Sequence, residues 1–284
     1  MTSLSLMAPA KLNLFLHINA QRADGYHELE TLFTFLDFGD ELNFTCTQQD
    51  DIEIEGDTGA IALEDNLIYK AAVALRPFRS VETGISIKLS KKLPMGGGVG
   101  GGSSDAATTL LAINQLWKCN LSHQKLAEIG LKLGADVPVF VNGKTAFAQG
   151  VGEKLTAVNL PQRWFCVVFP NVHVSTGAVF THPDLPRNTP RLTSGWQLAN
   201  TNNDCEALVK KLYPEVEKTL GWLLKYGPTR MTGTGACCFV ELDCATAAQR
   251  VLDSLPSCWQ GFVAPSTNIS PAHTQLDSWL KMQK

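Results

Sequence analysis

The sequence predicts an α+β protein that is divided into two domains. At 284 residues the chain is longer than most single domains, which commonly contain about 100–200 residues. Segments with alternating apolar residues, typical of strands, occur in both halves of the chain. Segments with apolar residues at helical spacing lie between them in both halves. Strands and helices mixed in this way favour two α+β domains over an all-helical or all-sheet architecture.

The first half begins with a predicted strand. Between residues 11 and 19 apolar and polar side chains alternate, so we expect a strand with one buried side, formed by Leu12, Leu14, Leu16 and Ile18. Shorter alternations predict further strands at 42–46, 52–54 and 85–89. Helical spacing of apolar residues predicts helices at 66–78, 103–117 and 122–133.

A domain boundary is expected near residues 155–162, where Pro161 precedes an apolar strand at 165–169. We therefore place the first domain at 1–158 and the second at 159–284. A loop rich in Pro, Asn and Thr follows at 182–195. The remaining patterns predict helices at 204–226 and 245–254 and strands at 237–242 and 259–264.

Composition and charge exclude several classes of protein. The chain is 44% apolar and its formal charge is −3 without a long block of one sign, which argues against a nucleic-acid binder with a basic face. Its eight cysteines form no CxxC pair and no zinc pattern, so we expect buried thiols in a reducing compartment. No apolar run reaches about 18 residues, and the first residues lack a signal-peptide core. We expect no membrane contact and a cytoplasmic protein.

A glycine cluster lies between a predicted strand and a predicted helix. Residues 96–102 contain six glycines, interrupted only by Val99, and Ser103 and Ser104 follow. A helix that starts after a glycine loop presents free N–H groups and the positive end of its dipole, and both favour a phosphate. Glycine also lets the backbone approach phosphate oxygens closely, because it has no side chain. The cluster therefore predicts a phosphate-binding loop.

Other interpretations of this cluster are a flexible hinge, a dinucleotide fingerprint or a P-loop. The short distance to the flanking strand and helix argues against a hinge. Gly96, Gly98 and Gly101 satisfy GxGxxG, but residues 116–121 lack the acidic residue that a Rossmann unit needs about 20 positions further on. GxxxxGK[ST] does not occur in the sequence, which excludes a P-loop.

Three further segments gain meaning only together. Lys11 and Asn13 share one face of the first strand, although a lysine at a strand start is usually just solvated. Asp136 precedes Val137-Pro138, where it could cap a helix or take part in catalysis. Met231-Thr232-Gly233-Thr234-Gly235-Ala236 forms a glycine turn before a strand.

With the glycine loop, these segments resemble the motifs of the GHMP kinase superfamily, in the same order along the chain. The similarity covers nearly the whole chain and is densest before residue 155. It is carried by Pro9–Leu14, Arg22–His27, Asp65–Ile68, Pro94–Asp105, Gly134–Val141, Gly150–Glu153, Leu185–Asn188, Asn203–Cys205 and Thr232–Gly235.

The resemblance implies a two-domain GHMP kinase fold with the active site in the cleft between the domains. Lys11 and Asp136 match the catalytic pair, in which the carboxylate would accept or orient the proton of an alcohol. The ATP site would comprise Asn66, Lys91, Pro94, Met95, Gly96, Gly97, Gly98, Val99, Gly100, Gly101, Gly102, Ser103 and Ser104. The substrate site would comprise Asn13, Tyr26, His27, Thr176 and Phe180.

The resemblance also implies a small-molecule diphosphocytidyl substrate and a place in the non-mevalonate isoprenoid pathway. Tyr26 and His27 match positions that contact a cytosine ring, and Phe180 matches an aromatic residue that would face Tyr26 across the base. ATP and Mg²⁺ would be the cofactors, although the glutamate that binds Mg²⁺ elsewhere in the superfamily has no match here. The protein would be a monomer or a weak homodimer.

Two alternatives remain at this stage. One is another GHMP-type kinase that acts on a sugar, homoserine or a mevalonate-like substrate, which would not require aromatic residues for a base. The other is a catalytically silent nucleotide-binding regulator, which would have lost Lys11 or Asp136.

Overall fold

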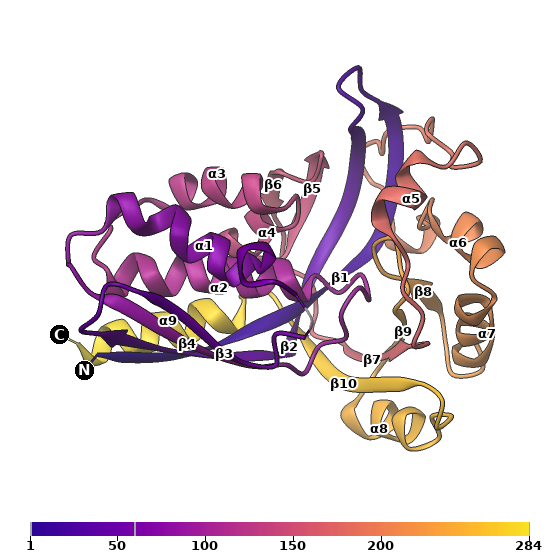
Figure 1. Cartoon of the computed structure of the whole chain (residues 1–284). Helices are drawn as coiled ribbons and strands as arrows, with labels where there is room; N and C mark the ends of the chain where they lie inside the picture. Colours follow the sequence, from indigo (N-terminus) through magenta and orange to yellow (C-terminus); the bar gives the residue numbers. More distant parts are fainter. Residues whose placement is uncertain (1, 60, 284) are drawn as a thin grey trace.

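Two long strands run through both halves of the molecule. The computed structural model describes residues 2–59 and 61–283. Strands β1 (Ser3–Gln21) and β2 (His27–Thr47) pair antiparallel along most of their length. Figure 1 shows this ribbon running from one half of the molecule into the other and ending in a hairpin that projects beside α5 (Thr176–Thr181). β1 and β2 therefore belong to both halves.

Over the described residues the strands join into one mixed sheet. Its order is β3-β4-β2-β10-β7-β9-β8, with β1 paired to β2 and with β5 paired to β2 and β6. Strand β10 links the two halves, because it pairs with β2 through Ser266 and Thr267 and with β7 along its length. The bounds are β3 (Ile52–Gly56), β4 (Gly84–Ser90), β5 (Ala146–Gly150), β6 (Lys154–Ala157), β7 (Trp164–Phe169), β8 (Thr229–Met231), β9 (Cys238–Leu242) and β10 (Gln260–Thr267).

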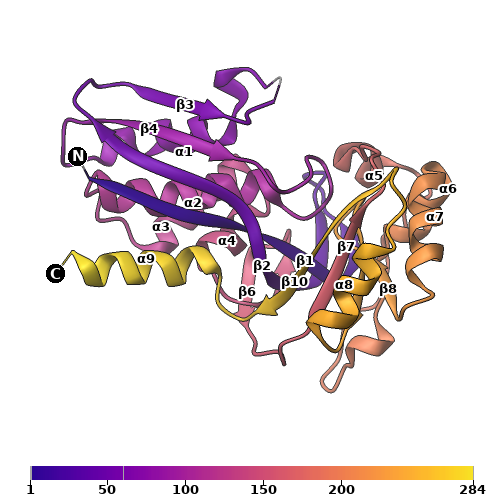
Figure 2. The same cartoon turned by 90° about the horizontal axis from the view of Figure 1, so that it is seen from below.

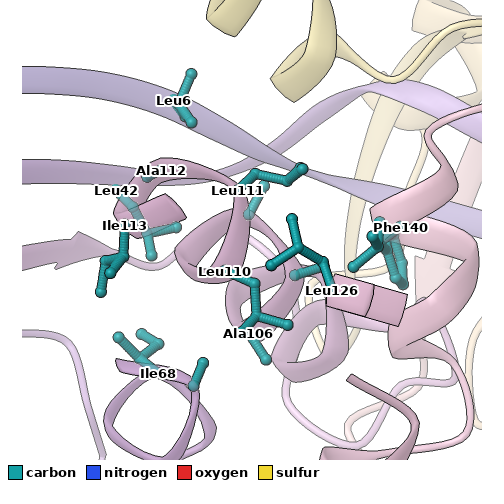
Figure 3. Packing of buried hydrophobic residues seen from close by; sticks show 14 of the residues in the cluster. Leu6, Leu42, Ile68, Ala106, Leu110, Leu111, Ala112, Ile113, Leu126 and Phe140 are labelled. Carbon is teal, nitrogen blue, oxygen red and sulfur yellow. The ribbon is translucent and has the colours of Figure 1, made fainter. Parts of the chain in front are cut away.

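Helix α2 is the centre of the first core. It packs among the ribbon, α1 and α3, and nearly all of its residues are buried. Figure 3 shows Leu110 and Leu111 of α2 between Leu42 of β2, Ile68 of α1 and Leu126 of α3. The helices in this half are α1 (Leu67–Leu75), α2 (Gly101–Leu116), α3 (His123–Leu133) and α4 (Val137–Asn142).

The C-terminal helix returns to this first core. Helix α9 (Pro271–Met282) runs back along β1, as Figure 2 shows, and it adds Leu276 to the core around α2. A division of the chain at residue 158 would separate α9 from the core on which it packs. The boundary between 1–158 and 159–284 stays a prediction.

The second core lies under the other end of the sheet. Cys166, Val168 and Val240 of the sheet pack against Val209 and Leu220 of two helices. The helices in this half are α5, α6 (Glu206–Leu212), α7 (Pro214–Leu223) and α8 (Ala245–Asp253).

Strand β1 differs from the prediction in its burial. The predicted face is buried, but Phe15 and His17 on the other face are buried as well. The prediction that only one side of this strand is buried was therefore wrong. The cause is the position of β1 between two core clusters, together with a register shift between Asn13 and Leu16. A local pattern could not show this second cover.

Helix boundaries also differ from the prediction. The stretch 204–226 forms the two helices α6 and α7, which separate at Pro214. The predicted helix 66–78 is α-helical only to Leu75, and a 3-10 turn with Pro77 follows, because proline cannot continue the hydrogen-bond ladder. Helix α2 begins at Gly101 and not at Ser103, because Gly100 adopts φ +77° and forms its N-cap. The loop at 182–195 contains no helix or strand, as expected.

The thiols agree only partly with the expectation. All eight cysteines are free and five are buried, but Cys244 and Cys258 are exposed. Among residues 2–59 and 61–283, no helix is both long and apolar enough to cross a membrane.

Candidate active site

Lys11 of β1 is buried against the glycine loop. Its side chain is only 3% exposed. The ammonium donates to Asn13 Oδ1 at 2.6 Å and to Gly98 O at 3.0 Å, and it lies 3.2 Å from Asp136 Oδ2. A buried ammonium needs such partners, because an unpaired charge away from water is costly. The solvated lysine that the local pattern favours is therefore wrong for this chain.

Asp136 occupies the N-cap position of α4 but does not cap it. Its side chain makes no hydrogen bond to the first turn of the helix. The carboxylate turns instead to Lys11 and is 38% exposed. Because the N-cap interpretation required a bond to a backbone N–H, the geometry favours the alternative, a carboxylate that faces a cavity.

The glycine loop is held through its carbonyl groups. Gly97 O accepts from Cys237 N at 2.9 Å, Gly98 O accepts from Lys11 Nζ, and Val99 O accepts from Lys11 N at 3.0 Å. Gly100 O accepts the first intrahelical bond of α2, from Ser104 N at 2.8 Å. With its carbonyls bound to the protein, the loop offers N–H groups and the start of a long helix, which suits an anion.

Two glycines are required by the protein itself. A Cβ at Gly98, where φ is +76°, would lie 2.5 Å from Thr232 O. A Cβ at Gly100 would lie 2.8 Å from the ring of Phe140. By contrast, a Cβ at Gly102 would meet only Leu67, at an ordinary 3.6 Å.

Lys91 lies below the loop and bridges two buried carboxylates. Its ammonium lies 2.5 Å from Asp40 Oδ2 and 2.8 Å from Asp105 Oδ2. Burial and the neighbouring Asp40 raise the pKa of Asp105 to about 7, although Lys91 opposes this. Burial works against the charge of Lys91, but the two carboxylates outweigh it and raise the pKa of the ammonium.

One cavity, of about 360 Å³, is lined by the glycine loop. Asn66, which accepts from Ile68 N and so caps α1, lies on its wall, as does Lys91. Most of the residues predicted for ATP line this cavity. They are Asn66, Lys91, Pro94, Met95, Gly96, Gly97, Gly98, Gly100, Gly101, Gly102 and Ser103. Val99 and Ser104 are buried and are not part of the lining.

A second cavity, of about 460 Å³, lies between the ribbon and α5. Its walls come from both halves of the chain, so it occupies the predicted cleft. Lys11, Asp136 and Gly98 of the glycine loop form part of its wall, and the aromatic rings of Tyr26, His27 and Phe180 form another part. All residues predicted for catalysis and substrate binding line this cavity, namely Lys11, Asn13, Tyr26, His27, Asp136, Thr176 and Phe180.

The aromatic wall differs in one detail from the expected pair. The ring of Phe180 lies 5.2 Å from the ring of His27, whereas Tyr26 is 61% exposed on the hairpin. Arg187 donates from Nε to His27 Nε2 at 3.1 Å and from its terminal nitrogen to Phe180 O at 2.9 Å. Burial and the charge of Arg187 lower the pKa of His27.

The two cavities meet at a small set of residues. Gly98, Ser103, Asp136 and Thr176 belong to the lining of both. Thr176 also shares a hydrogen bond of 3.0 Å with Thr234, which ties α5 to the turn between β8 and β9. A phosphate on the glycine loop and a hydroxyl in the aromatic cavity can therefore approach each other at Asp136.

Several residues of the site received no role from the sequence. Thr232 Oγ1 accepts from Asn13 N at 2.9 Å, and Thr31 Oγ1 accepts from Asn13 Nδ2 at the same distance. Asp40 supports Lys91 from a strand far away in the chain. Thr232 and Arg187 lie in segments that carry the resemblance, which was the available signal, but nothing near Asp40 indicates its contact.

Family models match both halves of the chain. GHMP kinases N terminal domain matches residues 66–144, and GHMP kinases C terminal matches residues 183–261. The chain is 63% identical over 275 residues to a 4-diphosphocytidyl-2-C-methyl-D-erythritol kinase of Pseudoalteromonas translucida, covering 97% of each protein. It is 54% identical to the kinase of the same name from Tolumonas auensis, covering 95% of each.

Solved structures agree with this relationship. The crystal structure of a 4-(cytidine 5'-diphospho)-2C-methyl-D-erythritol kinase matches with a TM-score of 0.82 at 32% identity, covering 93% of this chain and 99% of that one. A homoserine kinase from Cytophaga hutchinsonii matches with a TM-score of 0.65 at 19% identity, covering 96% of each chain, which shows a shared fold. The chain is an ATP-dependent phosphotransferase with the two-domain GHMP fold, and it belongs to the 4-diphosphocytidyl-2-C-methyl-D-erythritol kinase family of the GHMP kinases.

Proposed function

We propose that this protein transfers the γ-phosphate of ATP to the 2-hydroxyl of 4-diphosphocytidyl-2-C-methyl-D-erythritol. The observation that carries the proposal is the junction of the two cavities at Asp136 and the glycine loop. One cavity suits a nucleoside triphosphate and the other suits a polar molecule with an aromatic end. The high identity to kinases named for this substrate over nearly the whole chain supports the same assignment.

In this proposal the glycine loop holds the phosphates of ATP. The N–H groups at the start of α2 face the β- and γ-phosphates, and the absence of a Cβ at Gly102 lets the phosphates approach this turn. The adenine lies further out, beside Asn66 and the apolar residues Leu67 and Met95. The charge of Lys91 is balanced by Asp40 and Asp105, so we assign this lysine a supporting role next to the loop and not a direct contact with the phosphates.

Asp136 and Lys11 act on the acceptor hydroxyl. An alcohol attacks faster when its proton is accepted as the bond to phosphorus forms. Asp136 is the accessible carboxylate at the junction, so it orients the hydroxyl and takes its proton. Lys11, fixed by Asn13 and Gly98, keeps the carboxylate in place and stabilises the developing negative charge.

Mg²⁺ supplies charge neutralisation on the phosphates when it is bound. Among the described residues, no three His, Cys, Asp or Glu side chains form a group that could hold a metal on its own. The site nevertheless fits Mg²⁺, because this ion commonly binds one or two protein oxygens and completes its shell with phosphate and water. Ser103, which lines both cavities, is the residue that would hold it.

The cytidine end of the substrate occupies the aromatic end of the larger cavity. Tyr26, His27 and Phe180 provide ring surface there. Stacking of a base on an aromatic ring contributes about 1–3 kcal/mol. Asn13, close to Lys11, is placed to hydrogen-bond the hydroxyl groups of the methylerythritol.

An ADP-release assay with a panel of alcohols tests this proposal. The panel contains 4-diphosphocytidyl-2-C-methyl-D-erythritol, galactose, homoserine and mevalonate. We expect ADP release with the first compound alone, and ³¹P NMR should show a new phosphomonoester on its 2-hydroxyl. Turnover of another alcohol at a higher kcat/KM would replace the substrate assignment, and ADP release without a phosphorylated product would reject the transfer.

A further inference from the structure

Arg187 makes an unusual contact with His27 for a residue outside the cavity lining. Its guanidinium donates through Nε to His27 Nε2 at 3.1 Å. The same group donates to three backbone carbonyls, those of Leu185, Phe180 and His182, at 2.8–3.0 Å. Four hydrogen bonds fix the guanidinium, so its position relative to the imidazole does not depend on a ligand.

This contact determines where the imidazole carries its proton. A guanidinium can only donate hydrogen bonds and stays protonated in proteins. Nε2 of His27 must therefore present its lone pair to Arg187, which leaves the proton of the neutral ring on Nδ1. The imidazolium is disfavoured as well, because it would direct an N–H at the guanidinium. The lowered pKa of His27, caused by burial and by Arg187, agrees with a neutral ring.

The proton on Nδ1 is available to a ligand. His27 lines the larger cavity. Within the described residues Nδ1 makes no hydrogen bond, and it is not sealed off from solvent. Nδ1 therefore offers a hydrogen-bond donor, beside the ring of Phe180, in the region where the proposed function places the pyrimidine.

We infer that Arg187 is the positioning residue that makes this site select cytosine over uracil, by holding His27 as a donor at Nδ1. The inference rests on the proposed function. Cytosine N3 is an acceptor and pairs with the Nδ1 donor, whereas uracil carries a hydrogen on N3 and places two donors against each other. A buried polar site rejects a ligand that leaves its groups unpaired. If the tautomer were free to change, the imidazole could accept from uracil and the selection would weaken.

Two nucleotide inhibitors measure the selection directly. We expect CMP to compete with the organic substrate more strongly than UMP does in the wild type. Arg187→Met removes the donors, and Arg187→Gln offers a carbonyl that tolerates the other tautomer. In both variants the ratio of the UMP and CMP inhibition constants should fall by about tenfold, the value of one good hydrogen bond. Arg187→Lys, which can only donate, should restore part of the ratio.

Arg230→Met is the matched control. Arg230 also ties backbone segments together, since it donates to Leu14 O and Leu198 O, but it contacts no imidazole. Its loss should lower stability without changing the ratio of the two inhibition constants. An equal fall in the ratio in Arg230→Met would mean that loosening of the fold, and not the tautomer, controls base selection.

NMR of ¹⁵N-histidine tests the tautomer without any nucleotide or variant of Arg187. The His27 signals, assigned by their loss in His27→Asn, should show a protonated Nδ1 and an unprotonated Nε2 in the wild type. A proton on Nε2, or an unchanged inhibitor ratio in Arg187→Met and Arg187→Gln, would overturn the inference. If neither CMP nor UMP competed with the substrate while the expected tautomer was present, the cytidine pocket of the proposed function would fail instead.

Discussion

Lys11 Nζ lies 3.2 Å from Asp136 Oδ2, and the two members of this ion pair differ strongly in exposure. The lysine side chain is 3% exposed and the aspartate side chain is 38% exposed. Lys11 is fixed from below by Asn13 and Gly98, while Asp136 forms part of the wall of both cavities. A molecule that enters either cavity therefore meets the carboxylate, with the cation held behind it.

Loss of this cation should reduce turnover and stability together. In Lys11→Met, we expect kcat to fall by about 10²–10³, the usual effect of removing one electrostatic donor from a site. The free energy of unfolding should fall by about 1–3 kcal/mol, because Asn13 Oδ1 and Gly98 O lose their donor. Steady-state kinetics and urea unfolding check this, with Lys211→Met as the control for an exposed ion pair. A kcat within threefold of the wild type would contradict the role of Lys11.

Two alanine substitutions separate the roles of the glycines. Gly102 lies in α2 and its Cβ would fit without a clash. Gly102→Ala should therefore stabilise the fold by about 0.5–1 kcal/mol, while KM for ATP rises because the methyl group occupies the phosphate space. Gly98→Ala should instead destabilise the fold, since its Cβ would lie 2.5 Å from Thr232 O. Thermal unfolding and ATP titrations decide, and an unchanged KM in Gly102→Ala would place the phosphates elsewhere.

Phe180 should matter for the organic substrate and not for ATP. If its ring stacks on the cytosine, Phe180→Ala weakens the diphosphocytidyl substrate by about 1–3 kcal/mol, mainly through KM. The effect on kcat should be small, because the base is remote from the reacting hydroxyl. Competition experiments with CMP provide the check. CMP that competes with ATP, or a KM that stays at the wild-type value in Phe180→Ala, would show that the pocket is misplaced.

The buried Asp105 should make stability depend on pH. Its pKa is about 7 in the folded protein, raised above the ordinary value of 3.8 mainly by burial. The folded state therefore binds a proton more tightly than the unfolded state, and this contribution to stability is lost as pH rises from about 4 to 7. Relative to Asp105→Asn, the wild type should lose stability as pH rises over this window. Urea unfolding at pH 4.5 and 7.5 measures the difference, and parallel pH curves for both proteins would contradict it.

The sequence predicted the elements with strong local signals. The structure contains the predicted strands at 52–54 and 85–89 and the predicted helix at 122–133. They could be predicted because alternation and helical spacing depend only on neighbouring residues. The order of motifs gave the family and most of the residues around both cavities. These predictions needed no knowledge of how distant segments meet.

Contacts between distant segments could not be predicted. The second buried face of β1 depends on cover from the other half of the chain. Helix α9 returns to the first core, and Asp40 of β2 contacts Lys91, which lies 51 positions further along the chain. Arg187 is 160 positions away from His27. The oligomeric state and the cytoplasmic location stay predictions, since the fold of a single chain determines neither of them.

Asp136→Asn gives the most direct test of the account. The substitution keeps the shape of the side chain, and no cap of α4 is lost because the carboxylate makes none. Calorimetry should show near wild-type affinities for ATP and for the diphosphocytidyl substrate, with the unfolding free energy lowered by about 1–3 kcal/mol because the buried Lys11 loses its carboxylate partner. Single-turnover transfer should slow by about 10²–10⁴, the range for a positioned acid–base group. Asp184→Asn, which removes an exposed carboxylate paired with Lys211, serves as the control and should leave all three quantities unchanged. A folded Asp136→Asn protein that binds both substrates and transfers phosphate at the wild-type rate would contradict the central claim.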